Sequence, residues 1–149
     1  MNASGGGVMQ MTNGTNWEIR EYKGWQDNVV KLIPHDTYVR LAKFKGVEFY
    51  GTPFFMSYFI PPQKGSPLEG KNIWEAHWDG NGSAIHCYRA AKKSLAEFYK
   101  RHYNTKLVGL IDSSNKKAAK MARLLGFWPT GQFIFYEGIC YVLSIKEGE

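Results

Sequence analysis

Two side chains able to exchange protons lie two residues apart in the aromatic stretch NIWEAHW. The stretch alternates like a β-strand, so Glu75 and His77 share one face, while Trp74 and Trp78 share the other. A carboxylate and an imidazole on one strand face are suited to general acid–base catalysis. The structural alternative makes Glu75 a cross-strand ion pair and His77 a hydrogen-bonded residue of the sheet. Glu75 and His77 are the candidate catalytic residues.

A glycine-containing junction, DGNGS at residues 79–83, follows this stretch and precedes a long segment with helical periodicity. The first amides of a helix have no acceptor inside the helix and point outward at the positive end of its dipole. Gly80 and Gly82 have no Cβ, so a diphosphate can approach their backbone, and Ser83 can add a hydroxyl. The alternative is a simple turn, because Asp-Gly and Asn-Gly are common turn dipeptides.

The elements before this junction are predicted to be strands and a loop. Residues 17–22 alternate like a short strand, and Asp27 is placed to cap a helix. Two aromatic and β-branched runs in residues 47–60, broken by Gly and Pro, predict a β-hairpin. Residues 61–70, rich in Pro and Gly, predict a loop that interrupts the sheet.

The elements after the junction alternate between helix and strand. Apolar residues recur at three- and four-residue spacing from 85 to 102 and predict a helix, and KLVGLID predicts a strand over 106–112. A second helix is predicted over 115–125 and ends at Gly126. Residues 132–145 predict a hairpin turning at its Glu-Gly pair. This order predicts an α/β or α+β domain with a mixed sheet flanked by helices.

Composition limits the chain to a few classes of protein. Its 149 residues, 44% hydrophobic and 21% charged, predict one globular domain over 15–149 after a flexible leader at 1–14. It has no apolar stretch long enough to span a membrane and no secretion signal at its start, so we expect a cytoplasmic protein. Cys87 and Cys140 lack the spacing of a zinc site, and no metal is expected.

Positive charge is concentrated in one part of the chain. The net charge is +6, yet residues 83–123 hold ten Lys or Arg against two Asp or Glu and so carry +8. A cationic surface of this kind favours an anionic partner, which can be a nucleic acid, an acidic protein or a phosphorylated small molecule. The sequence has no recognised nucleic-acid-binding motif, so a nucleic acid is not the expected partner.

The segment IDSSNKKAAKMARLLGF, residues 111–127, resembles the second half of the acyl-CoA-binding core of the GNAT superfamily of acetyltransferases. There, a strand is followed by an Asn that opens a helix, an Ala three residues later and a Gly-Phe pair. Asn115, Ala118, Gly126 and Phe127 stand at those spacings.

Two upstream features extend this resemblance. The family hallmark places Gln or Arg, two residues, Gly, one residue, and Gly or Ala before a long helix; His77, Gly80 and Gly82 occupy this pattern with His in the first place. The letters WEAH are similar to the Glu-x-His found on the equivalent strand of many small phage-encoded members.

The resemblance implies a GNAT-like acyl-CoA N-acyltransferase fold and a cofactor, acetyl-CoA, as acyl donor. The strand ending at Trp78 and the strand 106–112 would splay apart around the pantetheine arm, and the junction amides would hold the diphosphate. The reaction implied is N-acetyl transfer by direct attack of an unidentified amine, with Glu75 or His77 taking its proton. The acceptor is a small molecule or a protein. The implied cofactor-binding residues are Trp78, Asp79, Gly80, Asn81, Gly82, Ser83, Ala84 and Asn115.

The sequence departs from the family at two points. Members that use a tyrosine as general acid carry it seven residues after the Asn, where this chain has Ala122. Tyr88, Tyr136 and Tyr141 are possible substitutes. The strand also runs almost directly into Asp79, which shortens the phosphate loop.

These departures favour an alternative function, in which the protein keeps the GNAT fold without catalysis. It would then be a phage protein, either a component of the virion or a protein that binds a phage or host partner.

Overall fold

The computed structural model describes residues 19–20, 44–52, 55–80 and 83–148. The predicted leader at 1–14 and the helix expected from Asp27 lie outside these residues. The described part contains one mixed sheet of seven strands in the order β1-β2-β3-β4-β5-β7-β6. The strands are β1 (Ile19–Arg20), β2 (Val47–Thr52), β3 (Phe55–Ile60), β4 (Ile73–Gly80), β5 (Lys106–Asp112), β6 (Trp128–Tyr136) and β7 (Ile139–Lys146).

Most of the strand pairing is antiparallel and continuous. β2, β3 and β4 form a meander, and the hairpin predicted over 47–60 is confirmed as β2 and β3. The hairpin predicted over 132–145 is also confirmed, because β6 pairs with β7. Its turn residues Glu137 and Gly138 both have a positive φ, of 50° and 80°, which favours Gly and produces the twist that a tight hairpin requires.

Both predicted helices after the junction are present, α3 after β4 and α4 after β5. Helix α3 (Ala84–Arg101) begins after Ser83, whose hydroxyl accepts a hydrogen bond from the His86 amide. Helix α4 (Lys116–Leu124) begins after Asn115, which caps it through the Ala118 amide, and ends at Gly126 with a φ of +99°. Neither of these described helices is long and apolar enough to cross a bilayer.

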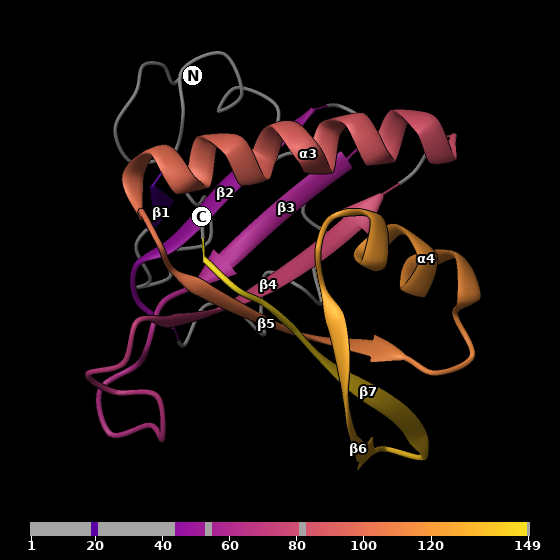
Figure 1. Cartoon of the computed structure of the whole chain (residues 1–149). Coiled ribbons are helices and arrows are strands. Elements are labelled where there is room, and N and C mark those ends of the chain that lie inside the picture. The colour runs from indigo at the N-terminus through magenta and orange to yellow at the C-terminus, as the bar shows by residue number, and fades with distance from the viewer. Residues whose placement is uncertain (1–18, 21–43, 53–54, 81–82, 149) are drawn as a thin grey trace, which may run out of the picture.

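Both helices pack on the same face of the sheet, as Figure 1 shows, with α3 crossing β2, β3 and β4 and α4 beside the end of β5. Buried residues of the two helices and of the strands beneath them form a single cluster. Phe98 of α3 stacks on Phe59 of β3 with ring centroids 4.4 Å apart, and Phe127 meets Trp78 edge to face at 5.2 Å. The predicted α/β fold with a mixed sheet is therefore confirmed.

β4 and β5 are paired at one end only. Their parallel pairing covers Ile73 to Glu75 on β4 and stops there, after which the two strands diverge (Figure 1). Beyond this point β4 remains paired with β3 and β5 with β7. The sheet therefore opens into a fork on the side where α3 begins.

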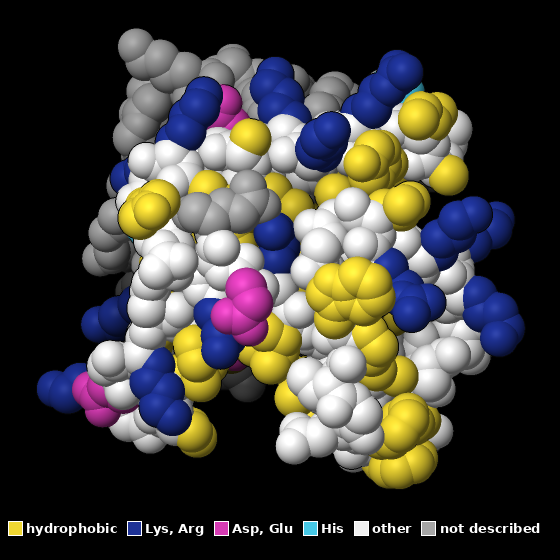
Figure 2. Space-filling model, in the orientation of Figure 1, with side chains coloured by type: hydrophobic (Ala, Val, Ile, Leu, Met, Phe, Trp, Pro, Cys, Tyr) yellow, Lys and Arg dark blue, Asp and Glu magenta, His cyan; other side chains and the backbone are white. Residues whose placement is uncertain are grey.

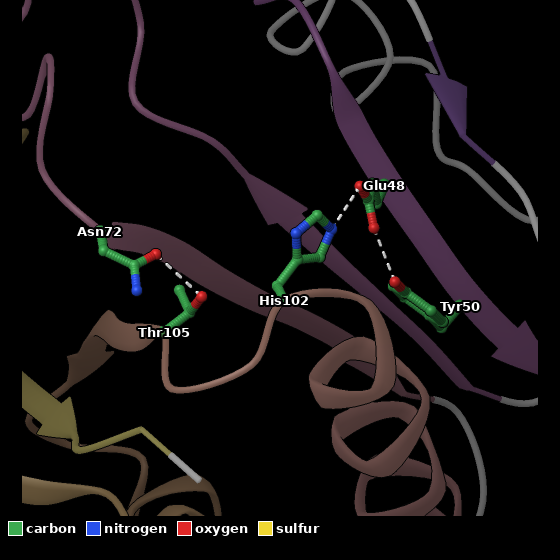
Figure 3. Close-up of polar contacts among 5 residues, drawn as sticks. All are labelled: Glu48, Tyr50, Asn72, His102 and Thr105. Atoms are coloured by element: carbon green, nitrogen blue, oxygen red, sulfur yellow. Dashed lines mark hydrogen bonds and ion pairs between the residues drawn. The ribbon is translucent and has the colours of Figure 1, made fainter.

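The paired end of the fork is closed by hydrogen bonds between side chains (Figure 3). Glu48 of β2 is fully buried and accepts from the Tyr50 hydroxyl at 2.7 Å, and its other oxygen lies 2.7 Å from Nε2 of His102 at the end of α3. Nearby, the Thr105 hydroxyl donates to Asn72 at 2.9 Å. These contacts join β2, α3 and the starts of β4 and β5.

Candidate active site

A cleft of about 1070 Å³ occupies the open end of the fork. It lies between β4 and β5 and is bounded by the first turns of α3 and by α4. The residues that line it are Phe55, Tyr58, Ala76, His77, Trp78, Gly80, Ala84, Ile85, Cys87, Tyr88, Gly109, Leu110, Ile111, Asp112, Asn115, Lys117, Ala118, Lys120, Met121, Leu124 and Phe127.

One wall of the cleft is the exposed backbone of β4. The Asn72 carbonyl accepts from the backbone amide of Lys106 on β5 at 3.1 Å, so even-numbered residues of β4 direct their backbone groups toward β5. Past Glu75, β5 no longer pairs with β4, and the N–H and C=O groups of Trp78 and Gly80 face the gap. An extended ligand can hydrogen bond there as an added strand would.

The predicted turn begins later than the sequence pattern indicated. Asp79 and Gly80 belong to β4 and pair with Met56 and Phe55, so the expectation that the turn starts at Asp79 was wrong. The physical reason is packing: a Cβ at Gly80 would lie 2.9 Å from Cys87 Sγ and 3.0 Å from the Phe55 ring. Gly80 still lines the cleft, whereas Asp79 does not.

Asn81 and Gly82 of the predicted turn lie outside the described residues. The beginning of α3, immediately after them, leaves backbone donors at the cleft. The His86 amide donates to the Ser83 hydroxyl, and the Cys87 amide donates to the Ser83 carbonyl. The amides of Ala84 and Ile85, both residues that line the cleft, have no acceptor among the described residues. They are the donors that a helix N-terminus offers to an anion.

The opposite side of the cleft is cationic. Lys117 and Lys120 of α4 are exposed and line the cleft, and Figure 2 shows Lys and Arg side chains gathered over this helix. Asn115 also lines the cleft; its Oδ1 is used in capping α4, which leaves its NH₂ group as the donor to a ligand. The Asp112 carboxylate, close by, has a lowered pKa because the Ser114 amide and hydroxyl donate to it.

The predicted acid–base pair lies on the face of β4 opposite to the described helices α3 and α4. His77 lines the cleft, and its ring stacks on Tyr58 of β3 with centroids 5.1 Å apart and planes within 7°. Glu75 does not line the cleft, but its Oε1 lies 3.3 Å from His77 Nε2. The structure therefore brings the pair together and places the imidazole, rather than the carboxylate, at the cleft.

Comparison with known proteins identifies this architecture. No family model and no curated protein matches the sequence. Among solved structures, a GnaT-family acetyltransferase from Bordetella pertussis is similar, with a TM-score of 0.57 and 21% identity over 78% of this chain and 79% of that one. The chain has the GNAT fold.

Other acetyltransferases share this fold at lower identity. A phosphinothricin N-acetyltransferase matches with a TM-score of 0.52 and 16% identity over 64% of each chain. The aminoglycoside acetyltransferase AAC(6')-Ib, in a complex with ribostamycin and coenzyme A, matches with a TM-score of 0.50 and 12% identity over 65% of this chain and 59% of that one. This chain thus spans less than two thirds of the length of these two proteins.

In this GNAT fold the position expected for a general acid is closed. Ala122 is 1% exposed, belongs to the core and does not line the cleft. Of the three tyrosines considered as substitutes, Tyr88 lines the cleft, whereas Tyr136 and Tyr141 do not. Of these three, only Tyr88 is therefore positioned at the cleft.

Several cleft residues had no clear signal in the sequence. Tyr58 is found only through the register that pairs it with His77. The sequence placed Lys117 and Lys120 in the basic segment 83–123, but only the orientation of α4 brings them to the cleft. Cys87 is a half-buried free thiol at the cleft. A reliable β3–β4 register would have identified Tyr58, because paired residues of neighbouring strands share a face.

Proposed function

We propose that this protein is an acyl-CoA-dependent N-acetyltransferase that transfers an acetyl group from acetyl-CoA to an amine. The observation that carries the proposal is the fork between β4 and β5, which combines an exposed strand edge with helix amides and lysines. These groups suit a ligand with an extended polar arm and a phosphorylated end.

The residues of the cleft fit the cofactor at both ends. The backbone of Trp78 and Gly80 would hold the pantetheine arm, and the Ala84 and Ile85 amides would receive the diphosphate. Lys120 would add positive charge on the facing side. When bound, acetyl-CoA supplies the thioester carbonyl that the amine attacks.

His77 is the proposed general base, and Glu75 the residue that positions it. With Nε2–H donating to the Glu75 carboxylate, the neutral imidazole carries its lone pair on Nδ1. Nδ1 would take the proton as the amine nitrogen bonds to the acetyl carbon and the carbon–sulfur bond breaks. Stacking on Tyr58 restricts rotation of the ring and so keeps this atom in place.

The departing thiolate can leave without a dedicated acid. A thiol has a pKa of about 8.5, so the thiolate is a tolerable leaving group at neutral pH. Tyr88 or water would then supply its proton. Holding amine and thioester together provides much of the acceleration, so a missing tyrosine at Ala122 would slow the reaction without preventing it.

The test is an acetylation assay on a panel of small amines and peptides with a free N-terminus. Release of the free thiol of CoA measures the rate. His77→Gln should lower kcat about 100-fold and Glu75→Gln about 10-fold, with the Kd for acetyl-CoA nearly unchanged. Wild-type rates in both variants would remove this pair from the mechanism.

A second candidate function rests on Ala122 and on the extension of β4 through Gly80. Both features are compatible with a GNAT-fold phage protein that has lost catalysis and acts as a virion component or through a phage or host protein partner. It would act in the virion or in the host cytoplasm, where the enzyme would also work. A protein that binds acetyl-CoA but acetylates no amine in the panel would favour this candidate.

A further inference from the structure

The proposed function, on which this inference rests, fixes the side of the cleft that the amine reaches. Trp74, Ala76 and Trp78 of β4 pack with the core under the helices, so His77 lies on the opposite face. The cofactor would occupy the gap between β4 and β5, and an amine that gives its proton to His77 has to approach from the face of the imidazole. We call this side of the cleft the acceptor face.

The strand register shows that β5 contributes two residues to the acceptor face. Glu75 pairs with Val108, and successive side chains alternate, so Leu110 and Asp112 lie on the same face as His77. Both residues line the cleft, and Leu110 is 45% exposed. An apolar side chain and a carboxylate therefore stand across the gap from the imidazole.

β7 and β6 continue the acceptor face beyond β5. Leu143 of β7 pairs with Leu110, and Tyr141 of β7 pairs with Asp112. Tyr141 pairs in turn with Ile134 of β6, which is 41% exposed. Residues paired across neighbouring strands share a face, so these side chains extend the surface that begins at Leu110.

The two sides of the acceptor face differ in polarity at the open end of the fork. β4 contributes the polar side chains of Glu75, His77 and Asp79. β5, β7 and β6 contribute the three aliphatic side chains just named, together with the Tyr141 hydroxyl and one carboxylate, Asp112, at the end of β5. Polar groups thus lie where the amine nitrogen would lose its proton, and apolar groups lie where the rest of the acceptor would be held.

We propose that the acceptor is a primary amine carried by an apolar alkyl or aryl group, which packs on Leu110, Leu143 and Ile134 while its nitrogen faces His77. Such a group removes exposed apolar surface from water. A second positive charge on the group would lose hydration against these aliphatic side chains, which offer it no acceptor. The Asp112 carboxylate at the rim attracts the ammonium form in which amines arrive.

The test is an NMR titration of the isotope-labelled full chain with the four linear amines from propylamine to hexylamine. CoA is present and cannot donate an acetyl group, so binding is measured without turnover. The four amines carry the same charge, and differences in Kd therefore report apolar contact. Each added methylene should lower the Kd about threefold, close to the full effect of burying a CH₂ group, and the methyl signals of Leu110 and Ile134 should shift.

A substitution on β5 tests which residue determines this preference. Leu110→Asn exchanges an exposed apolar side chain for a polar one of similar size, so the fold should be retained while each methylene changes the Kd less than about 1.5-fold. The control is Tyr103→Asn, which changes an 80% exposed aromatic residue that does not line the cleft and should leave the threefold steps intact.

A diamine tests the preference for an apolar group over a charged one. 1,5-Diaminopentane is similar in length to hexylamine but has an ammonium group at its far end. It should bind about tenfold more weakly than hexylamine, because that charge would lie against the aliphatic side chains of the acceptor face.

Four results would overturn the proposal: no binding by any of these amines, a Kd independent of chain length, unchanged steps in Leu110→Asn, or a diamine that binds as tightly as hexylamine. Failure of the proposed function is distinguishable. The expected Kd series without acetylation when acetyl-CoA replaces CoA would remove the transferase activity and leave the amine site. Acetylation of all four amines with equal kcat/KM would keep the activity and remove the preference.

Discussion

Two glutamate–histidine pairs of this sheet lie in different surroundings. At the paired end of the fork, Glu48 is fully buried, its two oxygens are occupied by Tyr50 and His102, and the distance to the imidazole is 2.7 Å (Figure 3). At the open end, the Glu75 side chain is 44% exposed and lies 3.3 Å from His77, beside the cleft.

The difference shows how one combination of residues can serve two purposes. A buried carboxylate is stable only if its lone pairs are satisfied, so the Glu48 pair serves to hold the end of α3 on β2. The Glu75 pair is partly hydrated and leaves one imidazole nitrogen for other use. The closed pair stabilises the fork, and we assign chemistry to the open one.

The largest effect is expected from removing the buried carboxylate. Glu48→Ala removes the carboxylate that binds the buried Tyr50 hydroxyl and the part-buried His102 ring, and should lower the free energy of unfolding by about 3 kcal/mol. Glu75→Ala is the matched control and should cost less than about 1 kcal/mol, because that pair is partly solvated. Urea unfolding measures both. Equal losses would mean that the two pairs do not differ as described.

A smaller effect is expected at the open end, where β4 meets α3. Gly80→Ala places a Cβ 2.9 Å from Cys87 Sγ and 3.0 Å from the Phe55 ring, and the crowding should destabilise the fold by about 2 kcal/mol. Gly109→Ala, whose Cβ would lie 3.4 Å from the Ala76 carbonyl, should be tolerated. Thermal unfolding compares the two.

A double variant tests whether crowding causes the loss of stability in Gly80→Ala. Adding Cys87→Ala to Gly80→Ala removes the sulfur atom and should recover part of the lost stability, a coupling that a thermodynamic cycle measures. Strictly additive losses would contradict close packing between β4 and α3.

The smallest effect concerns Asp112, at the rim of the open end. Hydrogen bonds from the Ser114 amide and hydroxyl lower the pKa of this carboxyl in the folded protein. Its contribution to stability is therefore present above the unfolded pKa and is lost as the pH falls through the folded pKa. Ser114→Ala should raise the Asp112 pKa part of the way to the usual ~3.9, as carboxyl NMR titration would show. An unchanged pKa would mean that the hydroxyl contributes nothing.

Much of this architecture could be predicted from local patterns. The period of apolar residues predicted both described helices, and apolar runs separated by turn residues predicted both hairpins. Alternation along the strand placed Glu75 and His77 on one face. These features depend on near neighbours in the chain, which is why a single sequence reveals them.

Other features depend on contacts between distant segments and were not predictable. The letters DGNGS are compatible with a strand that ends at Trp78 and with one that ends at Gly80. Only the packing of Gly80 against Phe55 and Cys87 determines where β4 ends. Glu48 lies in an aromatic and β-branched run that does not reveal its burial or its partner fifty-four residues away. The position of the imidazole at the cleft likewise depends on the β3–β4 register.

Isothermal titration calorimetry of the full chain with acetyl-CoA asks whether the open end of the fork holds this cofactor. We expect saturable binding of one acetyl-CoA per chain and a higher Tm in its presence. Binding should be weaker in Lys120→Glu, which reverses a charge at the cleft, than in the control Lys100→Glu, which changes an exposed α3 lysine away from the cleft. No heat of binding and no Tm shift at millimolar acetyl-CoA would show that the cleft does not hold this cofactor.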